Sequence, residues 1–353
     1  MHSITERAET AIGRDDAGAD WQLRPQEHAR TLPAEAAPLK RVLERAELQE
    51  IMQRFRSADA AASSAQARYK RVGRAGLYAA TIATLAGALF LLPLEAWLAG
   101  PAGAATSAVQ ILALATAFLA SRLLALAKPF DAWMKQRAEA EIARVGLFDA
   151  IAHANEGNSA AELPFLPLML AYFQRYQLGV QRRYYRERGA QHAAAVWRNN
   201  RWLSASMWLT ALSLAIAIAA GLHVAAAFGL PLPRQLAAWS AAIPRPDAHR
   251  VVLALGVIAS GLYGLGVARS LMDLDERNAS RYLTTADNLD YLVETGLQHA
   301  RDAAAAGNAE PVLAFIAQMQ ELISAEHQEW VLFRERGPKP PPRNMAGPAL
   351  PGR

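Results

Sequence analysis

The sequence predicts an all-α membrane protein in which four transmembrane helices form two hairpins with long cytoplasmic helical stalks. Two observations lead to this fold class. Of the 353 residues, 52% are hydrophobic and 20% are charged, and the two kinds are segregated along the chain. Apolar stretches long enough to cross a bilayer alternate with charged stretches of helical periodicity. This segregation is typical of a membrane protein rather than of a soluble globular one.

The apolar stretches give the four predicted spans. They are residues 75–94, 107–126, 203–222 and 251–268. At about 1.5 Å per residue, a 20-residue helix covers roughly 30 Å, the thickness of the hydrocarbon core. Arg122, near the end of the second stretch, is the one charged residue in them.

Basic residues gather on one side of the spans and predict their orientation. They are Arg68, Lys70, Arg71 and Arg74 before the first span, Lys128, Lys135 and Arg137 after the second, Arg198 and Arg201 before the third, and Arg269, Arg277 and Arg281 after the fourth. The turn between the first two spans carries only Glu95, whereas the linker between the third and fourth spans carries Arg234, Arg245 and Arg250 against Asp247 and is weaker evidence. The positive-inside rule therefore predicts cytoplasmic termini in the inner (plasma) membrane of the cell.

The hairpins and their flanking helices divide the chain. The first hairpin with its cytoplasmic helices covers 38–158, the second covers 159–305, and a C-terminal helix covers 309–336. Residues 1–37 are predicted to form a disordered tail, and 337–353, rich in proline, a flexible one. The stretches that begin at residues 67 and 195 share an aromatic residue, a basic cluster and an uncharged span. They indicate a weak tandem repeat, although any two membrane hairpins look alike at this level.

Between the spans, the cytoplasmic segments show apolar stripes of helical period. These segments are 40–66, 130–152, 164–196 and 311–333. The stripe of the second segment consists of Phe130, Met134, Ala138, Ile142, Val145 and Phe148. Arg137 with Glu141, and Glu141 with Arg144, stand at helical pair spacings on this segment. We expect these pairs to be exposed and to contribute only about 0.2–0.5 kcal/mol each.

Two short motifs resemble a known family. Trp133, Arg137 and Glu141 lie in "W133…R137-A-E-A-E141" directly after the first hairpin, and Glu326 and Trp330 lie in the closing "AEHQEW". The pattern is similar to that of the SLATT group, the SMODS and SLOG-associating two-transmembrane effector domains, and of a related family of unknown function. The resemblance implies a membrane effector of bacterial conflict systems that forms pores or disrupts the membrane. The second hairpin departs from the family plan.

Several side chains have both a functional and a structural interpretation. Glu326 stands at a seam position of the last helix, where it either fixes helix register or is simply exposed, while Trp330 is expected to pack against the stalk. Gln110, Thr116 and Ser121 lie inside the second span. They either line a pore or form hydrogen bonds between helices.

Two further groups of residues suggest contacts with other helices and with lipid. Gly256, Gly261 and Gly264 give the fourth span a small-residue face for close packing. The basic cluster "QRRYYRER" suggests contact with anionic lipid, and nothing in it indicates nucleic acid. Its arginines are Arg182, Arg183, Arg186 and Arg188.

No catalytic, cofactor-binding or metal-binding motif is found. The chain has no cysteine, and its histidines lack metal-ligand spacing. The first functional hypothesis is an oligomeric membrane effector, triggered by a cytoplasmic sensor, a nucleotide-signalling partner or a small ligand. The alternative is a non-conducting membrane scaffold that anchors a cytoplasmic partner. A small-solute transporter comes third, because the spans lack clear intramembrane ionisable groups.

Overall fold

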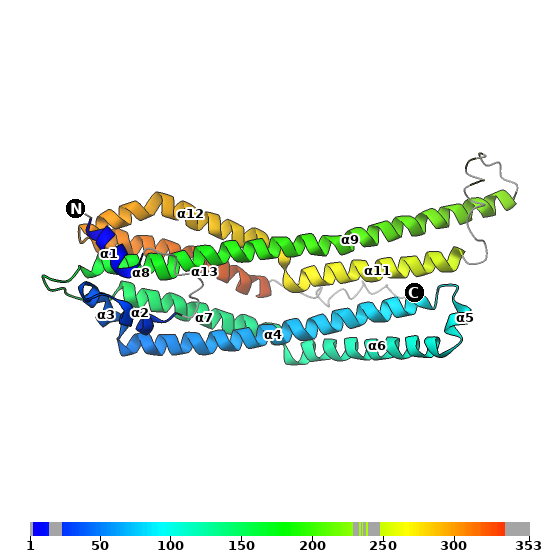
Figure 1. Cartoon of the computed structure of the whole chain (residues 1–353), viewed down its shortest axis with the longest axis horizontal. Coiled ribbons are helices and arrows are strands. Elements are labelled where there is room, and N and C mark those ends of the chain that lie inside the picture. The colour runs from blue at the N-terminus through cyan, green and yellow to red at the C-terminus, as the bar shows by residue number, and fades with distance from the viewer. Residues whose placement is uncertain are drawn as a thin grey trace, which may run out of the picture. The chain divides into compact units, whose positions relative to one another are not determined.

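The structure is a computed structural model that describes residues 3–13, 23–228, 233, 235, 238 and 248–335. Every regular element in these residues is a helix, as predicted (Figure 1). The chain forms two compact units. Unit 1 consists of Met1–Asp59, Met134–Arg186 and Leu283–Arg353, and unit 2 of Ala60–Trp133 and Glu187–Tyr282. Each unit therefore combines segments from both predicted halves, 38–158 and 159–305.

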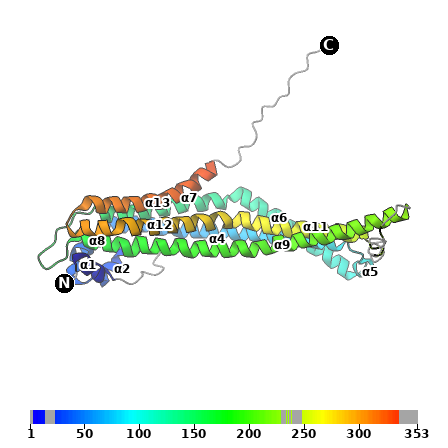
Figure 2. The ribbon, with the colours of Figure 1, turned by 90° about the horizontal axis from the view of Figure 1, so that it is seen from above.

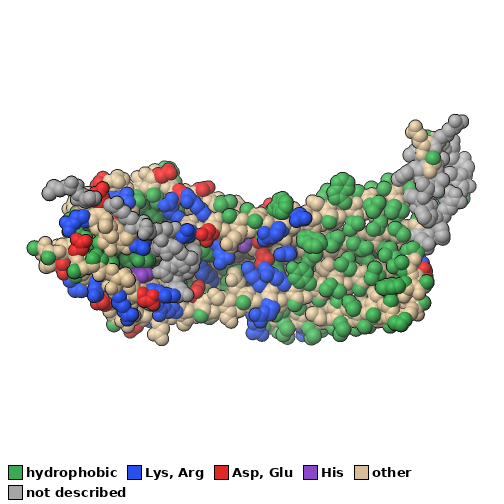
Figure 3. Space-filling model, in the orientation of Figure 1, with side chains coloured by type: hydrophobic (Ala, Val, Ile, Leu, Met, Phe, Trp, Pro, Cys, Tyr) green, Lys and Arg blue, Asp and Glu red, His purple; other side chains and the backbone are tan. Residues whose placement is uncertain are grey.

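Among the described residues, four helical stretches are long and apolar enough to cross a membrane. They are Ala46–Leu89, Pro101–Ala127, Phe165–Leu222 and Ala248–Ala305. These stretches contain the four predicted spans, except for the last residues of the first span. On the face shown in Figure 3, hydrophobic side chains cover the apolar part of unit 2, and Lys and Arg side chains gather at one end of it.

In unit 2, α4 (Ala46–Leu89) and α6 (Pro101–Ala127) run antiparallel. Glycines allow their close approach: a Cβ atom on Gly76 would lie 2.8 Å from the Cβ atom of Ala120, and one on Gly87 would lie 2.8 Å from Nε2 of Gln110. The first span was predicted to extend to residue 94, but α4 ends at Leu89. Turns and the short α5 (Glu95–Leu98) follow, because Pro93 has no N–H group to continue a helix.

The other apolar helices of unit 2 are α9 (Val180–Ala227) and α11 (Ala248–Asp273). They also run antiparallel. The Ser213 hydroxyl donates to the carbonyl of Val252 at 3.0 Å, and a Cβ atom on Gly266 would lie 3.1 Å from the Leu203 side chain. Small and apolar contacts of this kind replace the hydrophobic effect where helices pack in lipid.

Unit 1 is built around helices of mixed polarity. They are α7 (Pro129–Ala152), α8 (Phe165–Phe173), the π-helical turn Gln174–Gly179 that leads into α9, α12 (Asp275–Ala305) and α13 (Ala309–Glu335). The core of unit 1 contains four aromatic rings: Phe148 contacts Tyr172 and Phe173, and Phe173 contacts Phe315, at centroid distances of 6.1–6.5 Å.

The N-terminal residues are not a disordered tail where the structure describes them. Residues 3–13 and 23–43 form α1 (Ile4–Ile12), α2 (Pro25–Thr31), the 3-10 turn Ala34–Ala36 and α3 (Ala37–Leu43). Figure 2 shows α1 and α2 beside α8. Ser3 and Glu6 form a capping box at the start of α1, and Ala8 and Ile12 are buried. The prediction was wrong because such short helices gain their stability from tertiary packing. Residues 337–353 lie outside the described residues.

The buried stripe of α7 also differs from the prediction. Ile142 is 71% exposed, whereas Arg144 is only 4% exposed. The stripe that faces the core runs through Ala140, Arg144, Leu147, Phe148 and Ile151. Arg144 fits into the core because its guanidinium carbon lies 5.3 Å from the centroid of the Phe55 ring, where the cation is attracted to the aromatic face.

Candidate functional site

Each pair of apolar helices is followed by a sharp break. The first break lies at Lys128, which has a left-handed backbone (φ 41°) between α6 and α7. Pro129 disfavours a right-handed helical conformation at the residue before it. Trp133, one of the predicted motif residues, lies beside this break: its ring centroid is 5.7 Å from that of Phe130 and 6.2 Å from that of Tyr69.

The second break lies at Leu274, which has φ 51° between α11 and α12. A left-handed conformation is unfavourable for a branched side chain, so the surrounding contacts must hold it in place. Two carboxylates, Asp273 and Asp275, flank the break, and side chains from two other helices hold them. We call this set the junction network; it consists of Lys70, Arg74, His192, Asn199, Asp273 and Asp275.

Asp275 is the more buried of these carboxylates, with 3% of its surface exposed. Its Oδ1 atom lies 2.7 Å from Nδ1 of His192, and its Oδ2 atom accepts a hydrogen bond of 3.1 Å from the amide of Asn199. Both partners come from α9. A buried carboxylate requires such partners, because an unpaired one would bear the full cost of desolvation.

Asp273 is held from α4 instead. Its carboxylate lies 3.4 Å from Nζ of Lys70 and 3.3 Å from Nη2 of Arg74. The backbone carbonyl of Asp273 accepts a hydrogen bond from the amide of Asn278 at 3.1 Å. The α11–α12 break is thus fixed from one helix of each apolar pair, α4 and α9.

A second charged group surrounds the predicted motif residues Arg137 and Glu141 in unit 1. Arg137 lies 3.4 Å from Asp59 of α4 and 2.5 Å from Glu141, and Glu141 lies 3.8 Å from Nε of Arg144. The prediction that these pairs are exposed was wrong, because Arg144 is buried and Glu141 nearly so. This Arg137–Glu141–Arg144 ladder joins α7 to α4 rather than decorating its surface.

The polar residues of the second span have different environments. Gln110 lies against Gly87 of α4, so it belongs to the contact between α4 and α6. Thr116 and Ser121 are exposed on the outside of α6, and their hydroxyls donate to the carbonyls of Leu112 and Phe118 in the same helix. These two side chains do not line a passage within a single copy of the chain.

The three predicted packing glycines also differ from one another. A Cβ atom on Gly261 would lie 3.0 Å from Thr84 of α4, so this glycine is in a close helix contact. At Gly256 and Gly264 the same atom would meet nothing within 4 Å. Only Gly261 has the predicted role within one copy of the chain.

The arginines that were expected to contact anionic lipid have protein partners. Arg182 donates through Nε to Asp290 of α12 at 2.6 Å, and Arg186 pairs with the same carboxylate. Arg188 donates to Gln191 at 3.1 Å. Arg182 and Arg186 therefore connect α9 to α12, whereas Arg188 contacts its own helix and Arg183 is half-buried. The side chains of Glu326 and Trp330 lie outside the described part of the structure.

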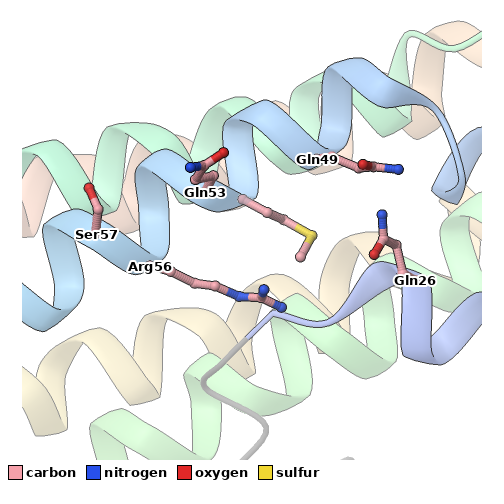
Figure 4. A pocket seen from close by; sticks show the side chains of 6 residues that line it. Gln26, Gln49, Gln53, Arg56 and Ser57 are labelled. Atoms are coloured by element: carbon pink, nitrogen blue, oxygen red, sulfur yellow. The ribbon is translucent and has the colours of Figure 1, made fainter.

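Unit 1 also contains an open polar pocket of about 510 Å³ (Figure 4). Its lining comes from α2 and α4. The residues are Gln26, Gln49, Met52, Gln53, Arg56 and Ser57. Among the described residues that line it, Arg56 is the one charged side chain and none is a carboxylate. The lining offers hydrogen bonds to a small polar molecule.

Comparison with known proteins gives no match to any family model, curated protein or solved structure. Within the described residues, no group of three or more His, Asp or Glu side chains could hold a metal ion.

Sequence reasoning missed the junction network. His192 lies 83 residues from Asp275, so no local spacing pairs them. The local signal was "MDLDERN", two aspartates directly after an apolar stretch. The Arg137 ladder was noticed in the sequence, but its burial was not, because helical periodicity alone assigned Arg144 to the exposed face.

Proposed function

We propose that the protein is an integral membrane effector that oligomerises and permeabilises or disrupts the bacterial inner membrane when a partner or a small ligand acts on it. The observation that carries this proposal is the outward-facing apolar surface of the four long helices. Only 11–22% of the residues in their most apolar 18-residue windows are buried within one copy. That surface requires lipid or other copies of the chain to cover it.

In this proposal, the apolar helices cross the membrane as two hairpins. Both termini and the charged helices lie in the cytoplasm, as stalks. The basic residues support this orientation, because Arg74, Lys128, Arg201 and Arg269 lie close to the apolar stretches of α4, α6, α9 and α11 on the side that adjoins the charged segments.

A passage for ions or solutes would form between copies rather than within one. Thr116 and Ser121 face outward from α6, where a neighbouring copy could bring such side chains together. The junction network then keeps the resting conformation, since it fixes the angle between α11 and α12. Changing a resting population of 99% to 1% requires about 5.5 kcal/mol of differential binding, which several subunits can share.

The alternative is a non-conducting scaffold that anchors a cytoplasmic partner. The hydroxyls of Thr116 and Ser121 favour this alternative. Each already donates a hydrogen bond to a carbonyl of its own helix, so neither requires a water-filled passage. For either function we propose no enzymatic activity, cofactor or nucleic-acid partner, but a cytoplasmic sensor or nucleotide-signalling partner.

Uptake of a membrane-impermeant DNA dye by live bacteria tests the proposal. The wild type is compared with Asp275→Asn at equal membrane abundance. Because this change removes the charge that His192 and Asn199 hold, we expect it to favour the open state and to increase uptake several-fold without a trigger. A scaffold would give no uptake with either protein. Glu276→Gln, an exposed neighbour, is the matched control.

A further inference from the structure

One turn of α9 has an exposed basic and aromatic face that the proposed function leaves unexplained. It lies in "WRNNRW", residues 197–202. Trp197 is 65% exposed and Trp202 is 40% exposed, and Arg198 and Arg201 are exposed as well. Their positions, i, i+1, i+4 and i+5, place all four side chains on one side of a helix. We call this surface the WRNNRW face.

Contacts within the WRNNRW face and behind it orient its side chains. The guanidinium carbon of Arg201 lies 5.4 Å from the centroid of the Trp197 ring, a cation–π contact that orients both side chains. Asn199, on the opposite side of the same turn, is buried and bonded to Asp275. Because these contacts already restrict the helix and its side chains, less conformational entropy is lost when a ligand binds the exposed side.

The position of the face along α9 indicates what it meets. The uncharged stretch of α9 begins directly afterwards at Leu203, which contacts Gly266 of α11. If the apolar helices are embedded as proposed, the four side chains are therefore level with the lipid headgroups. Tryptophan rings prefer this layer, and guanidinium groups bind phosphate oxygens with two parallel hydrogen bonds.

We propose that the WRNNRW face binds the phosphate of an anionic phospholipid, with Arg198 and Arg201 as the phosphate ligands and Trp197 and Trp202 between the acyl chains and headgroups. This inference rests on the proposed membrane insertion. It assigns lipid recognition to these residues in place of Arg182 and Arg186, whose partner is Asp290. Each arginine near an anionic surface is expected to improve lipid affinity about five-fold, equivalent to about 1 kcal/mol.

The test uses the full chain in phosphatidylcholine nanodiscs with a small fraction of dansyl-labelled lipid. Energy transfer from tryptophan is compared for labelled phosphatidylglycerol and labelled phosphatidylcholine. The wild type is expected to show more transfer to the anionic lipid. Arg198→Gln/Arg201→Gln keeps every tryptophan and is expected to lose most of this excess, while Arg198→Lys/Arg201→Lys keeps part of it.

The matched control is Arg30→Gln/Arg54→Gln, which removes the same charge from exposed positions of unit 1. The proposal is overturned if the Arg198/Arg201 glutamine variant keeps the excess, or if the control loses it equally. Displacement of the labelled lipid by inorganic phosphate at constant ionic strength would also overturn it, since it would indicate a site for a soluble anion. Failure of every variant to enter nanodiscs would instead contradict membrane insertion itself.

Discussion

Buried charges are the residues whose roles are most sharply defined. Arg144 and Asp275 are almost inaccessible, and each has partners from another helix or along its own. A buried charge that loses its partners is strongly destabilising, while one that keeps them makes the arrangement of helices specific. These side chains therefore determine how the charged helices dock, even though hydrophobic contacts provide most of the stability.

Replacing Arg144 tests its role in the ladder. We expect Arg144→Ala to destabilise the protein by about 2 kcal/mol, because it removes the cation–π contact with Phe55 and leaves Glu141 with one partner fewer. Chemical denaturation of the detergent-solubilised protein, followed by circular dichroism, measures the change. Arg54→Ala, at an exposed position of α4, should change the stability by less than about 0.5 kcal/mol. Equal effects of the two changes would contradict this role.

The loop between α7 and α8 should respond to acid. Hydrogen bonds from Arg45 and then Arg41 lower the pKa of Glu156, and hydrogen bonds from the Ser159 backbone and then Arg41 lower that of Glu162. Since both values lie below the ordinary 4.5, the stabilisation is complete above that pH and is lost as pH falls through the folded-state values. Amide exchange in residues 154–163, corrected for intrinsic rate, should therefore increase below about pH 4.5. Arg41→Gln should increase this amide exchange already at neutral pH. Exchange that did not change with pH would contradict the role of these carboxylates in holding the loop.

Residue by residue, the sequence identified the motif but not its environment. Trp133, Arg137 and Glu141 were singled out, and all three make specific contacts. Asp59, the partner of Arg137, lies 78 residues away along the chain, so only the packing of α7 on α4 could reveal it. Likewise, Asp275 lies 83 residues from His192, so the sequence did not reveal the role of this histidine.

At the level of helices, composition predicted the elements well and their ends less well. The four apolar stretches, apart from residues 90–94, and the charged segment after residue 129 are helical. The breaks at Lys128 and Leu274 were not predicted, because a left-handed conformation at a residue other than glycine has no strong sequence signal. The long helix α4 precedes α6, and the long helix α9 precedes α11. Both α6 and α11 are followed by a residue with a left-handed backbone, so the resemblance between the two predicted hairpins extends to their backbone conformation.

A pair of glycine substitutions tests the packing of α4 on α6. Gly76→Ala should destabilise the protein by about 1–3 kcal/mol, because the new methyl group would meet the Cβ atom of Ala120 at 2.8 Å and force the helices apart. Gly256→Ala, which would meet nothing within 4 Å, should stabilise it by about 0.5–1 kcal/mol. Thermal unfolding in detergent distinguishes them, and stabilisation by both would contradict the close contact.

At the scale of the whole molecule, the chain forms two compact units, and all four apolar stretches lie in unit 2. Unit 1 contains the Arg137 ladder and the polar pocket, and unit 2 contains the junction network. The sequence instead divided the chain at its hairpins, into 38–158 and 159–305. It did not predict which segments share a unit, since that depends on contacts between residues far apart in the chain.

The proposed orientation can be tested with single cysteines, because the natural chain has none. Ala99→Cys, in the connection between α5 and α6, should react with a membrane-impermeant maleimide added to intact cells. Ser159→Cys, in the loop before α8, should react only after the inner membrane is opened. Both positions are in connections rather than in the cores of the units. The reverse labelling pattern would contradict cytoplasmic termini.

Dye release from liposomes tests the central proposal most directly. Purified wild-type protein and Asp275→Asn are reconstituted at equal density into vesicles of anionic and zwitterionic lipid that contain a self-quenched dye. A membrane effector held closed by the junction network predicts slow release with the wild type and release several-fold faster with the variant. If neither protein releases dye at many copies per vesicle, although both have entered the bilayer, the effector proposal is contradicted and the scaffold is favoured.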